Sequence, residues 1–365
     1  MKFHFNENLK NITRTRAGTP ARLTSEDLFL DRNERAVPYP PEVMEALAVR
    51  LAKSRPNQYP ELEPFYDRVA EWVGLAPDQL FITDGVSGAI KALLEALAPG
   101  GANIVFPTPT FALYPVYARM FGVEPRTVGY DSQFQVDMAA LKDAVDADTA
   151  FVFLPNPNVP IEGYVPLEVI DDLARHCAGH DAALVIDEVY YLFGGETAKH
   201  LIGAHPNLFV MRSFSKGFGL PGARVGFVAG PAEIVEFVSR TRTGYETSTP
   251  AAEMVSFFLE HMDVIDGYVR QVKDGFAQLK TDLDGIGLRH NGGTTGNFIY
   301  IDLGGPAAVE AVVSALRDQG IHIRGGWPAP FDGGVAVTGA PPEQLARFFQ
   351  AFSAAVAELG ISTTA

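Results

Sequence analysis

Between residues 80 and 213, short and largely apolar segments alternate with longer amphipathic segments. The short segments lack the polar alternation of a half-exposed strand, so we expect both of their faces to be buried. Strands of this kind, separated by helices, are typical of a mostly parallel sheet that helices cover on both faces. The strand-like segments are residues 81–83, 102–106, 126–128, 150–154, 182–186 and 208–212, and the helical ones are 41–51, 62–74, 87–98, 111–121, 138–146 and 167–177.

The pattern changes after about residue 260. A long helical segment is expected over residues 250–283, followed by a strand, a helix, two short strands and a last helix, at 298–301, 306–319, 321–324, 334–338 and 342–358. The fold class is therefore α/β, with a second, smaller α+β domain at the C-terminus. We expect an N-terminal arm and small-domain segment over 1–40, a large domain over 41–260 and the small domain over 261–365.

Charge and cysteine content exclude several classes of protein. The chain has 29 Lys and Arg against 44 Asp and Glu, a net charge of −15, so it should repel nucleic acid and anionic membranes. A single cysteine, Cys177, excludes a disulfide scaffold and a multi-cysteine metal site, and the histidines show no HExxH pattern. No metal, nucleic-acid or membrane partner is expected, and no secretory signal is visible, so we expect a cytoplasmic protein.

Polar residues follow several of the apolar segments, where ligands bind in parallel sheets. Asp187 ends the apolar segment 183–186, and a carboxylate there is costly to ionise without a partner. That partner could be a cation, a protonated ring nitrogen or a metal. Alternatively, Asp187 simply caps the next turn.

The segment 211–227 places Lys216 among serines, glycines and arginines. A lysine that is desolvated near other cations has a lowered pKa and can attack a carbonyl. Ser213, Ser215 and Arg224 offer the hydroxyl and guanidinium donors that a phosphate needs. The alternative is a glycine-rich surface loop with a solvated lysine.

Two further features could serve a flat, phosphorylated ligand. The turn Gly85-Val86-Ser87 lies between a strand and a helix and would direct backbone N–H groups at an anion. Phe111 follows a strand and could stack on a ring, although a core position is the common alternative. With the nucleophilic lysine and the strand-end carboxylate, these features fit pyridoxal phosphate.

At these positions the chain resembles the fold-type I pyridoxal-phosphate-dependent aminotransferases, most closely the histidinol-phosphate aminotransferase group. The resemblance rests on S-F-S-K…G-L-x-G-x-R-x-G at 213–226 and D-E-x-Y at 187–190, and extends from Leu30 to the last helix. It implies three catalytic residues: Lys216 bonds the cofactor aldehyde, Asp187 keeps the ring nitrogen protonated and Tyr190 hydrogen-bonds the phenolic oxygen. The other cofactor-binding positions that it implies are Gly85, Val86, Ser87, Phe111, Asn158, Ser213, Ser215 and Arg224, with Tyr59 reaching the phosphate of a neighbouring subunit in a homodimer.

The chain departs from the family pattern at two places. Val159 stands where the family has an asparagine that touches the phenolic oxygen, and valine cannot donate a hydrogen bond. The arginine that grips the substrate α-carboxylate is absent from residues 334–339. Either Arg324 binds the carboxylate instead, or the substrate lacks an ordinary α-carboxylate. We place Arg324, Asn33 and Tyr114 among the substrate-binding residues.

Three functions are compatible with these residues. The first is a transaminase that moves an amino group between a small-molecule donor and an oxo acceptor, with an atypical substrate. The second is a decarboxylase, lyase or cyclase that uses the same cofactor. The third is a catalytically silent binding protein, against which the retention of Lys216, Asp187 and Arg224 argues.

Overall fold

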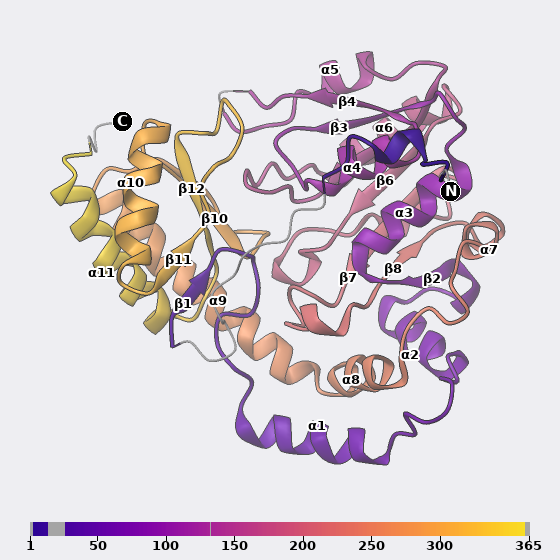
Figure 1. Cartoon of the computed structure of the whole chain (residues 1–365), viewed down its shortest axis with the longest axis horizontal. Helices are drawn as coiled ribbons and strands as arrows, with labels where there is room; N and C mark the ends of the chain where they lie inside the picture. Colours follow the sequence, from indigo (N-terminus) through magenta and orange to yellow (C-terminus); the bar gives the residue numbers. More distant parts are fainter. Residues whose placement is uncertain (1–2, 14–25, 132, 362–365) are drawn as a thin grey trace.

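The computed structural model describes residues 3–13, 26–131 and 133–361, and its centre is a seven-stranded sheet (Figure 1). The strand order is β2-β8-β7-β6-β5-β3-β4, and β8 alone runs antiparallel to its neighbours. The expected mostly parallel sheet is therefore confirmed. The strands are β2 (Leu80–Thr83), β3 (Asn103–Pro107), β4 (Glu124–Val128), β5 (Thr149–Pro155), β6 (Ala183–Asp187), β7 (Leu208–Ser213) and β8 (Gly226–Ala229).

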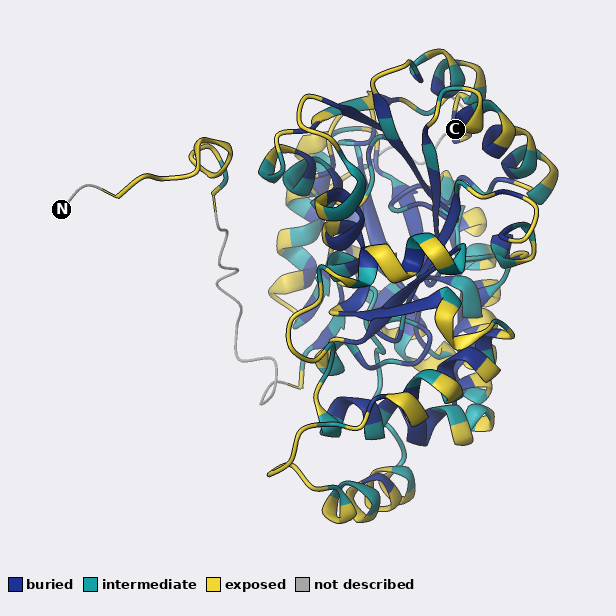
Figure 2. Ribbon diagram, turned by 90° about the vertical axis from the view of Figure 1, so that its right-hand side faces the viewer, coloured by how far each residue is buried: buried dark blue, intermediate teal, exposed yellow. Residues whose placement is uncertain are grey.

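Both faces of this sheet are buried because successive side chains of each strand enter opposite clusters. On β6, Leu184 and Ile186 pack into one hydrophobic cluster, whereas Val185 packs into the other. Helices α1 (Pro41–Lys53), α2 (Glu63–Val73), α5 (Met138–Asp143), α6 (Leu167–Ala178) and α8 (Thr249–Glu260) contribute to the first cluster. Helices α3 (Gly85–Leu97), α4 (Leu113–Met120) and α7 (Ala232–Ser239) contribute to the second, so the sheet is a buried middle layer (Figure 2).

A separate group of elements packs beside the large sheet (Figure 1). Strands β9 (His290–Gly292), β10 (Phe298–Asp302) and β12 (Gly334–Thr338) form an antiparallel sheet, and β1 (Leu28–Leu30) pairs in parallel with β11 (Ile321–Ile323). Helices α9 (Met262–Gly285), α10 (Pro306–Arg317) and α11 (Pro342–Glu358) complete its core. The division into 1–40, 41–260 and 261–365 stays a prediction.

Three expectations about elements need correction. The helix expected over 250–283 is two helices, α8 and α9, which are separated at His261, a non-helical residue with φ −125° and ψ 50°. Strand β8 begins at the end of the glycine-rich segment 211–227 and was not expected, and β1 and β9 were not expected either. These strands are short, and two of them pair with segments far away in the chain: β1 with β11, and β8 with β2.

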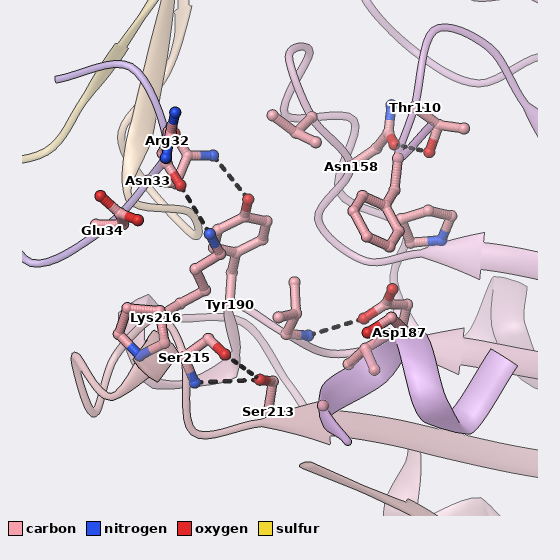
Figure 3. Close-up of a pocket in the computed structure, with 18 of the residues that line it drawn as sticks. Arg32, Asn33, Glu34, Thr110, Asn158, Asp187, Tyr190, Ser213, Ser215 and Lys216 are labelled. Atoms are coloured by element: carbon pink, nitrogen blue, oxygen red, sulfur yellow. Dashed lines mark hydrogen bonds between the residues drawn. The ribbon is translucent and has the colours of Figure 1, made fainter. Parts of the chain in front are cut away.

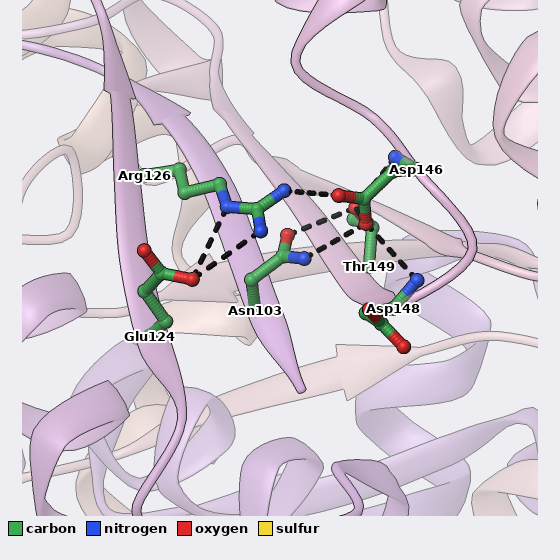
Figure 4. A network of polar contacts seen from close by, with 6 residues as sticks. All are labelled: Asn103, Glu124, Arg126, Asp146, Asp148 and Thr149. Carbon is green, nitrogen blue, oxygen red and sulfur yellow. Dashed lines mark hydrogen bonds and ion pairs between the residues drawn. The ribbon is translucent and has the colours of Figure 1, made fainter. Parts of the chain in front are cut away.

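A polar network holds the other end of the large sheet, where β3 and β5 begin (Figure 4). Asn103 is 1% exposed; its amide donates to Asp146 over 3.0 Å and accepts from the Thr149 hydroxyl over 2.9 Å. Arg126 on β4 pairs with Asp146, and this hydrogen bond holds the pKa of that carboxyl well below its usual range. The network therefore stabilises the edge of the sheet where β3 and β5 begin, which is the edge opposite to the carboxyl ends of these strands.

Candidate active site

A cavity of about 300 Å³ opens at the carboxyl ends of β5, β6 and β7 (Figure 3). Its walls come from the large sheet, from the segment after β1 and from β12 and the segment before it. It brings together most of the residues singled out from the sequence: Asn33, Gly85, Val86, Ser87, Phe111, Asn158, Asp187, Tyr190, Ser213, Ser215, Lys216, Arg224 and Arg324. Segments separated by up to about 290 positions thus meet at one site.

Lys216 lies inside this cavity rather than on the open surface. Its Nζ donates to the carbonyl oxygen of Arg32 over 2.8 Å. Burial lowers the pKa of Lys216 to about 8, with Glu34 opposing the shift and Arg324 and Arg224 adding to it. At pH 7 about a tenth of this amine is therefore neutral, and hence nucleophilic, far more than for an ordinary lysine.

The lowered pKa of Lys216 predicts a pH dependence. The neutral fraction grows as pH rises through about 8, so the rate at which cofactor-free protein bonds an aldehyde should rise up to that pH and then level off. Stopped-flow absorbance with pyridoxal phosphate measures this rate. A rate that keeps rising to the usual lysine value of 10.5 would show that burial does not activate Lys216.

Asp187 ends β6 at the bottom of the cavity and is 3% exposed. Its two oxygens accept hydrogen bonds from the Tyr114 hydroxyl over 2.6 Å and from the backbone N–H of Val189 over 3.1 Å. Burial raises the pKa of Asp187 to about 6, against these two donors. The carboxylate caps the following turn through the Val189 N–H, which is the alternative role considered for it above. It also lines the cavity, where a cationic partner would stabilise its charge.

The structure corrects the expectation for Tyr114. This side chain is fully buried, does not line the cavity, and stacks on Phe153 with 5.1 Å between ring centroids. Burial and the negative charge of Asp187 raise the pKa of Tyr114 well above its usual value, so its hydroxyl remains a donor. Tyr114 therefore orients Asp187 and cannot contact a substrate in this arrangement.

Tyr190 is held from the other side of the cavity. Its hydroxyl accepts from the Asn33 side-chain amide over 2.7 Å, and the Asn33 backbone N–H donates to the Thr338 hydroxyl over 2.9 Å. Burial raises the pKa of Tyr190, with the hydrogen bond from Asn33 opposing the shift. Asn33 thus reaches the cavity, where its amide is committed to Tyr190 (Figure 3).

An anion-binding corner forms at the start of α3. Gly85 has φ +64°, and a Cβ there would lie 3.0 Å from Nη2 of Arg224. This Nη2 donates to the Asp84 carbonyl and to the Ser87 hydroxyl, over 3.1 and 3.2 Å. The Ser213 hydroxyl donates to that of Ser215 over 2.9 Å nearby. A helix N-terminus, three hydroxyls and a guanidinium around one cavity suit a phosphate.

The two departures from the family pattern lie on the far wall of the cavity. Val159 lines the cavity, and the Asn158 side chain accepts from the Thr110 hydroxyl and donates to the Pro109 carbonyl, which holds it in place beside the missing amide. On β12 the cavity-lining residue is Ala336. Both apolar residues adjoin one aromatic cluster, made of Phe134, Tyr300, Trp327 and Phe331.

Arg324 lies at the rim of this wall. Its guanidinium stacks over the Trp327 ring, 4.3 Å from the ring centroid, and its backbone pairs with that of Ala336. Burial lowers the pKa of Arg324, but the group stays charged. Within residues 26–131 and 133–361, the stacking on Trp327 is its side-chain contact and no hydrogen bond or ion pair engages it, so its N–H donors are available to a ligand in the cavity.

Tyr59 lies away from the cavity of its own chain, whereas three cavity residues were not expected from the sequence. Tyr59 is 79% exposed, stacks on Tyr245 with 4.6 Å between centroids, and does not line the cavity of its own chain. Trp327 lines the cavity but was not expected there, because its isolated position in the sequence carries no motif. Arg32 and Glu34 were also missed as cavity residues, although they flank Asn33.

The cavity gathers a lysine whose pKa is lowered by burial, a buried carboxylate and an anion-binding corner. Together with the doubly covered sheet, these define an enzyme that bonds a carbonyl-bearing anionic cofactor. The chain belongs to the aminotransferase class I and II family, whose profile matches residues 25–352. It is accordingly a transaminase.

Among curated relatives, histidinol-phosphate aminotransferase of Thermosynechococcus vestitus is 28% identical over 363 residues, which cover 95% of this chain and 96% of that protein. The Pseudomonas putida (strain F1) enzyme of the same name is 30% identical over 302 residues, covering 81% and 84%. These full-length matches place the chain among proteins of similar size and architecture.

Solved structures show the same fold. Histidinol-phosphate aminotransferase from Sinorhizobium meliloti, in complex with pyridoxal-5'-phosphate, superposes with a TM-score of 0.82 at 23% identity, covering 91% of each chain. Aspartate aminotransferase from Thermus thermophilus with maleate gives a TM-score of 0.77 at 21% identity, covering 90% and 91%. No helix in the described part of the chain is long and apolar enough to cross a bilayer, and no metal-binding group of side chains occurs there.

Proposed function

We propose that this aminotransferase binds pyridoxal phosphate through Lys216 and accepts an amino donor without a carboxylate clamped at its amine-bearing carbon. The observation that carries the substrate part is the apolar wall formed by Val159, Ala336 and Trp327: β12 carries no arginine, and the Arg324 guanidinium is stacked over the Trp327 ring. A bidentate carboxylate clamp requires a guanidinium fork that an apolar side chain cannot replace. Arg324 at the rim would instead receive a more distant anionic group.

The residues of the cavity fit this cofactor. Pyridoxal phosphate supplies, when bound, an aldehyde carbon and an electron-withdrawing ring. The start of α3, the two serines and Arg224 would bind its phosphate, Phe111 would cover its ring, and Tyr190 would hydrogen-bond its phenolic oxygen. The Asp187 carboxylate would hold a proton at the ring nitrogen, since a buried carboxylate gains a cationic partner there.

Lys216 has two tasks in this scheme. Its neutral amine forms the bond to the cofactor, and once a donor amine has displaced it, Nζ can take and return a proton at the substrate carbon. Its contact with the Arg32 carbonyl keeps the amine on the side of the cavity where Asn33 and Tyr190 lie. The retained acid–base equipment supports transamination, and the relatives named above are histidinol-phosphate aminotransferases.

The assembly is part of the proposal. Tyr59 and Tyr245 are exposed and stacked on each other, and Met44 and Val49 on α1 are also exposed. Such apolar residues on one region of the surface support a homodimer in which Tyr59 reaches the cavity of the neighbouring subunit. The cytoplasmic location expected from the sequence stays a prediction.

A donor panel tests the proposed function. Protein loaded with pyridoxal phosphate is mixed with glutamate, alanine, aromatic and basic amino acids, amino alcohol phosphates and simple amines, and the absorbance of the bound cofactor is followed. Conversion to the pyridoxamine form by donors without an α-carboxylate, faster than by glutamate, supports the proposal. A faster reaction with glutamate would contradict the substrate assignment, and a spectral change without pyridoxamine would favour a decarboxylase, lyase or cyclase.

Substitution of Arg324 should separate binding from chemistry. Arg324→Gln removes the free guanidinium at the rim, so KM for an anionic donor should rise by about 10- to 100-fold while kcat changes little. Arg317→Gln is the matched control, because Arg317 lies in the adjoining groove and does not line the cavity. Equal effects of both substitutions on KM would show that general surface charge, and not Arg324, attracts the donor.

A further inference from the structure

The carboxylate of Glu162 links the wall of the cavity to the small sheet. Glu162 follows Val159 by three positions and is 9% exposed. Its two oxygens accept four donors from a single turn: the backbone N–H groups of Thr294, Thr295 and Gly296, and the Thr295 hydroxyl. The contacts of Thr295 are short, 2.6 Å for its N–H and 2.8 Å for its hydroxyl.

The turn that Glu162 holds, residues 294–296, leads directly to Asn297 at the start of β10. Asn297 is 1% exposed, and its amide donates to the carbonyl oxygen of Asn33 over 3.1 Å. Asn33 in turn donates to the Tyr190 hydroxyl over 2.7 Å. Three hydrogen-bonded steps and one backbone link therefore connect Glu162 with a hydroxyl inside the cavity.

Each of these steps has little freedom. The carbonyl oxygen of Asn297 accepts from Gly339 over 2.7 Å, which ties the turn to the end of β12. The backbone of Asn33 is in the left-handed region, with φ +55°, and its N–H donates to Thr338. The Asn33 side chain therefore has little freedom to adjust to Tyr190 independently of its own backbone. A shift of the 294–296 turn would thus displace Asn33 and alter its hydrogen bond to the Tyr190 hydroxyl. Among the described residues, this is the one hydrogen bond of that hydroxyl.

We infer that Glu162 is a positioning residue for Tyr190: it fixes the 294–296 turn, which through Asn297 and Asn33 sets the place of the Tyr190 hydroxyl. Asn33 donates to that hydroxyl, whose own proton then remains available for a bound partner. The inference rests on the proposed role of Tyr190 but needs no particular substrate. The carboxylate of Glu162 is needed because both of its oxygens accept hydrogen bonds. A glutamine at this position has one acceptor oxygen, and its NH₂ group would face N–H donors of the turn.

A double-mutant cycle tests this coupling. The wild type, Glu162→Gln, Tyr190→Phe and the double variant are loaded with pyridoxal phosphate and assayed with one donor. In the wild-type background, Glu162→Gln should lower kcat by about tenfold and change KM by less than about threefold. In the Tyr190→Phe background, the same substitution should lower kcat by less than about twofold, because the hydroxyl it positions is gone.

Two further variants make the result decisive. Thr295→Val removes one hydroxyl donor and should give a smaller loss of kcat in the same direction, even if Glu162→Gln folds poorly. Asp137→Asn is the matched control: its carboxylate caps α5 through the Ala140 N–H over 2.9 Å, and kcat should stay within about twofold. An unchanged kcat in Glu162→Gln, or equal losses in both backgrounds, would overturn the inference. Turnover by the wild type shows independently whether the proposed function holds.

Discussion

Lys216→Ala is expected to lower kcat by at least about 10⁴-fold, because one side chain both bonds the cofactor and moves the proton. The protein should still bind pyridoxal phosphate, since the start of α3, Ser213, Ser215 and Arg224 are unchanged, but without the absorbance band of the lysine-bonded form. The measurement combines the absorbance spectrum with single-turnover kinetics.

Lys91→Ala is the matched control for this experiment. Lys91 is an exposed lysine on α3 that does not line the cavity. Its loss should leave both the spectrum and kcat unchanged. If Lys216→Ala retained the wild-type band or more than about a hundredth of the turnover, another amine would have to carry the reaction.

Asp187→Asn is expected to have the second largest effect, a loss of about 10²- to 10³-fold in kcat. The amide is neutral and would not hold a proton at the ring nitrogen. Its NH₂ group would also oppose either the Tyr114 hydroxyl or the Val189 N–H, both of which donate to the present carboxylate. The kinetic loss should appear in kcat more than in KM, because the charge acts on the reaction rather than on donor binding.

Tyr114→Phe separates the two contributions of Asp187. It removes the donor at 2.6 Å but keeps the charge, so its loss of kcat should be well below that of Asp187→Asn. Denaturant unfolding of each variant checks that the fold is intact. Equal rates for Asp187→Asn and the wild type would exclude the ring-nitrogen role of this carboxylate.

Local patterns explain why much of the site could be predicted from the sequence. The residues around Lys216 lie within one short segment, and Asp187 directly follows an apolar strand, so neighbours along the chain are also neighbours in the cavity. Most of the central sheet could be predicted for the same reason, because β2, β3, β5, β6 and β7 are short apolar segments whose two faces enter the clusters around them.

The features that could not be predicted depend on contacts between distant segments. Trp327 lines the cavity from the segment between β11 and β12, and Tyr114 on α4 meets Asp187 although the two residues are 73 positions apart. The interruption at His261 lies between two segments with the same helical periodicity, so the periodicity alone extends across it. Strand β8 is recognised by its partners β2 and β7 rather than by its own composition.

The central claim is that Lys216 carries pyridoxal phosphate in a transaminase whose cavity lacks the usual carboxylate clamp. Absorbance spectra of the wild type and of Lys216→Ala with this cofactor, before and after titration with matched donors that differ only in an α-carboxylate, test it most directly. We expect a lysine-bonded band in the wild type alone, and its conversion to the pyridoxamine form at lower concentrations of the donor without the carboxylate. The same band in Lys216→Ala, or stronger conversion by the carboxylate-bearing donor, would contradict the account.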